Sequence, residues 1–164
     1  MTETYSRLHK TLHWATVALF VVQLLTYPAI ARTHVCHEGM KIDPWDLRIH
    51  KLHMISGGVI YVFALVRLWL RWRHPVARPE STPLWMWRMA SAVHISIYVM
   101  LLLLPISGFL KSYIVSAAGP VHVALTRVLY ALLAVHVAGA LWHAIVLRDG
   151  LAERMGLRLP FQKQ

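Results

Sequence analysis

Residues 120–147, PVHVALTRVLYALLAVHVAGALWHAIVL, decide what kind of fold this chain can form. The segment exceeds the roughly 20 apolar residues with which a helix crosses about 30 Å of hydrocarbon. Within it, His122 and His136 lie fourteen residues apart. Fourteen helical residues rise about 21 Å and complete nearly four turns, so both imidazoles lie on one face at two depths. The segment therefore predicts a membrane-spanning helix that carries two polar sites.

Three further segments, 12–31, 50–72 and 89–110, have similar length and apolar character. The 164-residue chain is 57% apolar and 15% charged, with a mean hydropathy of +0.51, which fits a membrane protein better than a soluble domain. Backbone amides in lipid must be hydrogen-bonded within their own segment, so we expect helices. The short connections predict an all-α, integral membrane four-helix bundle with up-and-down, antiparallel neighbours and a single domain over residues 1–164.

Basic residues are distributed unevenly among the predicted connections. The N-terminal segment, the second connection and the C-terminal tail are basic, with Arg7, Lys10, Arg71, Arg73, Arg78, Arg88, Arg148, Arg154, Arg158 and Lys163. In the first connection the charges balance, with Arg32, Lys41 and Arg48 against Glu38, Asp43 and Asp46. The positive-inside rule therefore predicts that both termini are cytoplasmic. This topology explains the net charge of +10, and we expect no nucleic-acid partner.

The first apolar segment has a second interpretation. Basic residues, an apolar run and Ala29-Ile30-Ala31 also resemble a secretory signal with its cleavage site. The run approaches full spanning length, however, and it contains His13 and Trp14. We therefore expect a retained first helix.

Histidine is unusually frequent in this chain. Of eleven histidines, six lie in or at the ends of the apolar segments: His13, His53, His94, His122, His136 and His143. Polar groups in lipid are costly and are interpreted first as functional. Two axial imidazoles leave haem iron without an open position, which suits electron transfer. Because the chain has one cysteine, Cys36, and no C-x-x-C-H sequence, we expect the haem to be bound non-covalently.

Each haem needs two histidines at one depth on facing helices. His53 and His122 lie near the outer starts of the second and fourth helices and are predicted to form the outer pair. For the inner pair, His13 can be matched with His136 or with His143. Pairing with His136 separates the irons by about 21 Å along the helix, which suits the size of two haems. Depth counted from the cytoplasmic arginines favours His143. We favour His136, because helix ends can project beyond the bilayer whereas haem size is constant, but the sequence leaves both open.

Arg67 falls fourteen residues after His53, on the same side of its helix and at the depth of the inner pair. A guanidinium there is predicted to bind a haem propionate. The alternative is an arginine that snorkels toward the inner surface.

His94 and His143 remain after four ligands are assigned, and both lie toward the cytoplasmic end. Imidazoles supply the hydrogen bonds and protons that quinone reduction needs, so these residues predict a quinone region, with a structural role as the alternative. Outside the apolar segments, we interpret the remaining polar residues near the first connection as solvated loop residues: His34, Cys36, His37 and His50.

Four stretches together resemble the bacterial cytochrome b561 family: YSRLHKTLHW (5–14), LHMISGGVIYVFALVRLWLRW (52–72), VHISIYVMLLLLPISG (93–108) and LLAVHVAGALWHAIVLRD (132–149). The resemblance implies a di-haem b cytochrome of the bacterial inner membrane that exchanges electrons with ubiquinone. It implies that His13 and His136 hold the cytoplasmic-side haem, that His53 and His122 hold the periplasmic-side haem, and that His94 and His143 lie near a quinone.

Some members of this family resemble superoxide oxidases, so the resemblance implies superoxide as the electron donor; no catalytic residue is assigned. Cations of the outer surface could steer this small anion: Lys111, Arg127, Lys41 and Arg48. The third connection, about nine residues, looks shorter than in superoxide-oxidising members, which argues against an outer substrate site. The alternative function is a haem-bearing membrane anchor that transfers electrons for a partner dehydrogenase or hydrogenase and has no substrate of its own.

Overall fold

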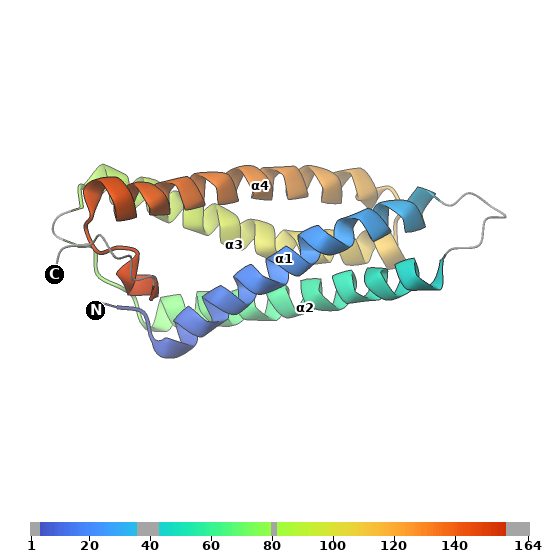
Figure 1. Cartoon of the computed structure of the whole chain (residues 1–164), viewed down its shortest axis with the longest axis horizontal. Helices are drawn as coiled ribbons and strands as arrows, with labels where there is room; N and C mark the ends of the chain where they lie inside the picture. The colour runs from blue at the N-terminus through green and yellow to red at the C-terminus, as the bar shows by residue number, and fades with distance from the viewer. Residues whose placement is uncertain (1–3, 36–42, 80–81, 157–164) are drawn as a thin grey trace.

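The computed structural model describes residues 4–35, 43–79 and 82–156, without the side chains of residues 34 and 35. These residues form four long helices: α1 (Arg7–Val35), α2 (Pro44–Arg73), α3 (Leu84–Tyr113) and α4 (Ala118–Trp142). A π-helical turn, η1 (His143–Leu147), continues α4, and a 3-10 turn, η2 (Glu153–Met155), follows. Successive helices run antiparallel (Figure 1). The predicted four-helix bundle is confirmed, and all four helices are long and apolar enough to cross a membrane.

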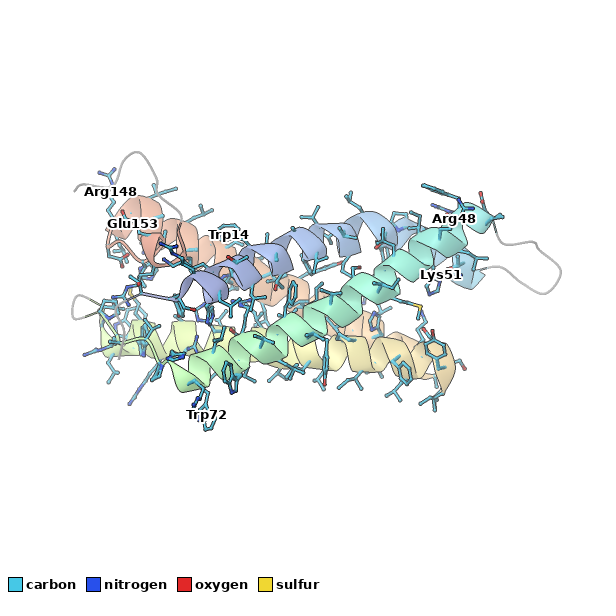
Figure 2. The ribbon with its side chains drawn as sticks, turned by 90° about the horizontal axis from the view of Figure 1, so that it is seen from below. Trp14, Arg48, Lys51, Trp72, Arg148 and Glu153 are labelled. Carbon is cyan, nitrogen blue, oxygen red and sulfur yellow. The ribbon has the colours of Figure 1, made fainter. Side chains whose placement is uncertain are left out.

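We call the end that holds residues 4–10, 70–79, 82–88 and 143–156 the terminal end, and the end that holds residues 30–35, 43–50 and 110–121 the distal end (Figure 1). Exposed charged side chains mark both ends: Arg148 and Glu153 at the terminal end, Arg48 and Lys51 at the distal end (Figure 2). Most of the exposed tryptophans, among them Trp14 and Trp72 (Figure 2), lie toward the terminal end, whereas Trp45 lies at the distal end. Such residues are typical of the boundary between lipid and water.

Helices α1, α2 and α3 extend at both ends beyond the apolar segments from which they were predicted, and α4 begins two residues before its segment, because hydropathy marks only the length in lipid. At the start of α2, Asp43 accepts a hydrogen bond from the Trp45 amide at 2.8 Å, and Pro44 occupies the first helical position. The predicted helix 120–147 is not α-helical throughout, since π geometry begins at His143. Only residues 114–117 connect α3 to α4, fewer than the nine expected.

The bundle consists of two closely packed hairpins. Helix α1 packs along α2 and α3 packs along α4, while α2 also contacts α3. The buried core joins three helices through Ile60, Ala64, Tyr98, Leu101 and Leu129. Helix α1 reaches α4 through side chains, as in the edge-on contact of Phe20 with Tyr130, whose ring centres lie 6.0 Å apart. Large apolar residues elsewhere point outward, which is the arrangement that lipid requires.

The segment after α4 folds back across the terminal end. Arg148 has a left-handed backbone, with a φ of 50°, and ends the π turn. The Trp14 indole then donates to the Met155 carbonyl at 3.0 Å, and Arg154 donates to the Ala77 carbonyl at 3.0 Å. These bonds connect the tail both to α1 and to the segment between α2 and α3.

Candidate functional site

Histidines from different helices meet at two depths in the bundle. Toward the distal end, His53 of α2 and His122 of α4 lie near one another, and each has its Nδ1 2.9 Å from a hydroxyl of a neighbouring helix. Toward the terminal end, His136 of α4 lies between two others: its ring centre is 6.4 Å from that of His13 in α1 and 5.0 Å from that of His94 in α3. The two histidines of α4, His122 and His136, therefore belong to two different groups of imidazoles.

The distal group is held by a hydroxyl from α1. Thr26 Oγ1 lies 2.9 Å from His53 Nδ1. The Thr26 hydroxyl proton is engaged by the Val22 carbonyl at 2.8 Å and the Gln23 carbonyl at 3.1 Å. A hydroxyl has one proton, so toward the imidazole the oxygen acts as an acceptor. His53 therefore carries its proton on Nδ1, which leaves the Nε2 lone pair for a metal.

His122 is held in the same way by α3. Its Nδ1 lies 2.9 Å from Ser107 Oγ and 3.1 Å from the Leu104 carbonyl oxygen. The Ser107 hydroxyl itself donates to Leu104 at 2.8 Å, and a carbonyl can only accept. Nδ1 of His122 is therefore the protonated nitrogen, and again Nε2 keeps its lone pair.

Gln23 also fixes the main chain around His53. Its amide nitrogen donates to the His53 carbonyl at 2.8 Å and to Ser56 Oγ at 2.7 Å. Both Thr26 and Ser56 are buried, at 3% exposure. These bonds hold α1 and α2 in a defined register at the depth of His53, because a slip of either helix would break several of them.

In the terminal group, the neighbour of His13 is a cation. One terminal nitrogen of Arg67 lies 3.1 Å from His13 Nδ1, and the guanidinium carbon lies 5.6 Å from the Tyr98 ring centre. Arg67 Nε is buried and has no hydrogen-bond partner among the described residues. An unpaired buried donor is costly, so this nitrogen is suited to an acceptor that is not part of the chain.

His143 lies apart from this group. Its Nδ1 forms a 2.6 Å contact with Asp149 Oδ2, and both side chains are largely buried, at 18% and 14% exposure. Asp149 also accepts a hydrogen bond from the Leu151 amide at 3.2 Å. The π turn at His143 and the reversed backbone at Arg148 bring the two side chains together.

The sequence interpretation missed His9, which is buried at 4% exposure and stacks at 4.7 Å on Tyr5. It lies beside a cavity of about 260 Å³ lined by Thr4, Tyr5, Ser6, His9, Leu70 and His74. His9 precedes His13 by one helical turn and so shares its face, a signal that was present in the sequence. Thr26 and Ser107 were also missed, although polar residues inside apolar segments point to contacts between helices.

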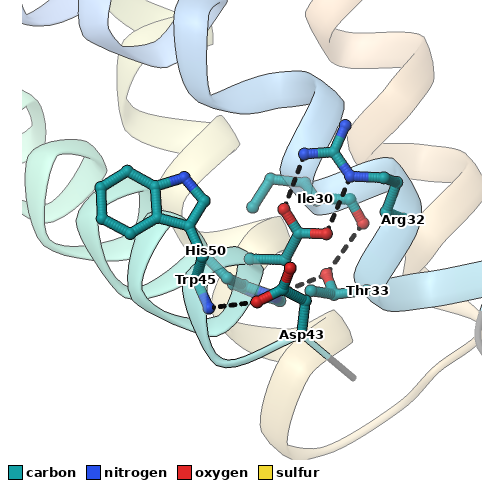
Figure 3. A network of polar contacts seen from close by, with 7 residues as sticks. Ile30, Arg32, Thr33, Asp43, Trp45 and His50 are labelled. Carbon is teal, nitrogen blue, oxygen red and sulfur yellow. Dashed lines mark hydrogen bonds and ion pairs between the residues drawn. The ribbon is translucent and has the colours of Figure 1, made fainter. Parts of the chain in front are cut away.

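His50 is not the solvated loop residue that we expected. It belongs to α2 and is half-buried, and its Nδ1 lies 3.0 Å from Thr33 Oγ1 (Figure 3). Beside it, Arg32 binds the Asp46 carboxylate with two hydrogen bonds of 2.8 and 2.6 Å. This polar network joins the end of α1 to the start of α2. Cys36, His37 and Lys41 lie outside the described residues, as does the side chain of His34.

Comparison with known proteins identifies the family. A sequence model described as prokaryotic cytochrome b561 matches residues 4–157. The chain belongs to the prokaryotic cytochrome b561 family. It is 31% identical over 153 residues to cytochrome b562 of Cereibacter sphaeroides, covering 92% of this chain and 94% of that protein. No solved structure matches the chain.

Membership of the cytochrome b561 family confirms the predicted resemblance and makes this a multi-pass bacterial membrane protein that binds haem b and transfers electrons. The residues present fit that cofactor. Two imidazole nitrogens bound to one metal at about 2 Å each place their ring centres about 6 Å apart, close to the 6.4 Å between His13 and His136. At the distal site, protonation of His53 and His122 on Nδ1 leaves the Nε2 atom of each as the nitrogen that would hold a metal.

Proposed function

We propose that this cytochrome b561 family member, as one domain over residues 1–164, binds two haem b groups and transfers electrons from a periplasmic one-electron donor to ubiquinone. The observation that carries the proposal is the approach of His13 and His136 from facing helices, with ring centres 6.4 Å apart. His53 and His122 lie near one another at a second depth. Haem b, when bound, takes up and releases one electron at a time. Two such sites at different depths suit electron transfer across a membrane.

His136, rather than His143, is the proposed second ligand of the inner haem. Its ring faces His13, whereas the Nδ1 atom of His143 is bonded to Asp149 beyond the end of α4. Arg67 is the proposed partner of an inner haem propionate, because it is buried beside His13 and its Nε has no acceptor in the part of the chain that the structure describes. A charge-assisted hydrogen bond to a carboxylate would satisfy that nitrogen.

We place the terminal end in the cytoplasm and the distal end in the periplasm, with the chain in the bacterial inner membrane. Basic residues concentrated in the terminal segments support this orientation. A fluorescent protein fused to the C-terminus should fluoresce, and a fused periplasmic phosphatase should be inactive. An active phosphatase fusion would reverse the orientation.

The proposed quinone region lies at the terminal end, near His94 and His143. His94 contacts the proposed inner ligand His136, so a quinone beside it would be close to the inner haem. The bonded pair of His143 and Asp149 can hold a proton and release it to a reduced quinone. Ubiquinone takes up two electrons and two protons to become ubiquinol.

Superoxide is the proposed donor: two superoxide anions each lose one electron and leave as dioxygen. Lys111 supports this choice because it lies near both His53 and His122, with its methylene groups beside Gly119. A cation beside the distal pair would attract a small anion. We expect Lys111→Gln to lower the rate constant of reduction by superoxide about tenfold. Lys51→Gln, an exposed cation at the same end (Figure 2), is the matched control and should have little effect.

Haem content tests the two sites. The purified protein should contain two haems per chain, and single alanine variants at His13, His53, His122 and His136 should each lose one. Alanine at His143 should retain both. A wild-type preparation with a single haem, or an H53A variant with two, would refute the proposed pairs.

The donor is tested by mixing the oxidised protein with superoxide without oxygen and following the reduced haem band. Reduction that superoxide dismutase prevents is the expected result. Reduction by dithionite but not by superoxide would reject superoxide and leave the haem-bearing anchor subunit as the function.

A further inference from the structure

We infer that Thr26 and Ser107 are positioning residues that set the protonation and orientation of the two distal haem ligands. This inference rests on the proposed function, since it takes His53 and His122 as ligands. Each hydroxyl uses its own proton on a carbonyl of its own helix and accepts a hydrogen bond from the histidine of the neighbouring helix. The same arrangement therefore holds both proposed distal ligands, once in each hairpin of the bundle.

The chemistry of iron binding explains why each histidine needs a hydrogen-bond acceptor at Nδ1. A histidine that binds iron through Nε2 must carry its proton on Nδ1, and that N–H needs an acceptor when it is buried in lipid. Such an acceptor also increases the electron donation of the imidazole, which favours ferric iron and lowers the reduction potential. Thr26, at 3% exposure, and Ser107, at 6%, are both buried.

Thr26 and Ser107 differ in whether a second acceptor lies near the same histidine nitrogen. Thr26 Oγ1 is the acceptor that the described residues offer to His53 Nδ1. His122 Nδ1 has two acceptors, Ser107 Oγ at 2.9 Å and the Leu104 carbonyl at 3.1 Å. Loss of the threonine hydroxyl should therefore be more damaging than loss of the serine hydroxyl.

The terminal group is built differently. There, the Arg67 guanidinium lies 3.1 Å from His13 Nδ1 and offers a donor and a positive charge instead of an acceptor. Iron binding through His13 Nε2 therefore requires Arg67 to turn to another acceptor, such as a propionate. An adjacent positive charge disfavours ferric iron, which itself adds positive charge, and so raises the potential of that haem. The hydroxyls lower the distal potential and the arginine raises the inner one, which makes electron transfer from the distal to the inner site favourable.

The test uses the haem-loaded protein, with redox titration of both haems and haem retention as readouts. The haem signal lost in H53A identifies the distal haem. Thr26→Val, which keeps the shape and removes the acceptor, should weaken distal haem binding about 10-fold to 100-fold. If the ferric form loses tenfold more affinity than the ferrous form, the distal potential rises by about 59 mV. Ser107→Ala should shift both readouts in the same direction but by less.

Thr33→Val is the matched control. Thr33 makes the same hydroxyl contact, 3.0 Å from His50 Nδ1, with its own proton on the Ile30 carbonyl at 3.0 Å, but His50 is not a proposed ligand. This variant should leave both potentials unchanged, and Thr26→Ser should restore the wild-type distal potential.

Equal effects of Thr26→Val and Thr33→Val, or failure of Thr26→Ser to restore the potential, would overturn the inference. If Thr26→Val does not retain the inner haem, Thr26→Ala takes its place, since it only removes atoms. Failure of the proposed function gives a different result, because H53A would then keep both haems. Loss of one haem in H53A with a silent Thr26→Val refutes the positioning role alone.

Discussion

Leu129→Ala tests whether the core of this bundle is stabilised by close packing of side chains rather than by the transfer of apolar groups out of water. Leu129 is 2% exposed and is the residue of α4 that packs in the buried cluster with Ile60, Ala64, Tyr98 and Leu101. It lies seven residues from both His122 and His136, midway between the two histidine groups. Truncation there leaves a cavity that α4 cannot easily fill.

The expected loss of stability depends on whether the unfolded side chain would be surrounded by water or by lipid. In a water-soluble core, Leu→Ala costs about 2–5 kcal/mol, as transfer from water and cavity formation combined. The transfer part is about 0.8 kcal/mol for each of the three carbon groups removed. In lipid that part is absent, because acyl chains are as apolar as leucine. We therefore expect Leu129→Ala to lower the free energy of unfolding by only about 1–2 kcal/mol.

The assay is unfolding of the haem-loaded protein in mixed micelles with increasing SDS, followed by far-UV circular dichroism. The matched control is Leu141→Ala, the same change on the same helix at a residue with 49% exposure, which should cost much less. Both haem bands should decline together, given the central position of Leu129. Equal costs for the two variants would refute the packing argument. A loss of more than about 3 kcal/mol in the free energy of unfolding would show that transfer from water contributes after all.

Three further variants test individual contacts. His143→Ala should keep both haems but slow quinone reduction about 100-fold in stopped-flow measurements; an unchanged rate would remove it from the quinone region. Gly108→Ala places a Cβ 3.2 Å from His122 Cε1, so the imidazole ring must shift by a few tenths of an ångström. We expect the purified variant to lose the distal haem selectively, as measured by its haem content. Ala64→Phe, at a residue with 0% exposure, should cost about 1–3 kcal/mol in the same unfolding assay through overpacking; the exposed Ala131→Phe is its control, and equal costs would contradict the expectation.

The number of helices and the candidate ligands could be predicted without the structure, for a local reason. A span is recognised from a continuous apolar run, and the positions of His122 and His136 on one face follow from the rise and turn of a single helix. Neither inference depends on what the helix packs against. The same local reasoning would have found His9, one turn before His13.

The sequence by itself determined a four-helix membrane bundle with polar groups at two depths, since both follow from properties of single segments. Only the tertiary structure decided which side chains meet: Thr26 with His53, Ser107 with His122, and His143 with Asp149 rather than with the histidines of α1 and α3. These contacts depend on the rotation of each helix about its axis and on the π turn after Trp142. Among lipid-embedded helices no hydrophobic face sets that rotation, so close packing and interhelical hydrogen bonds determine it.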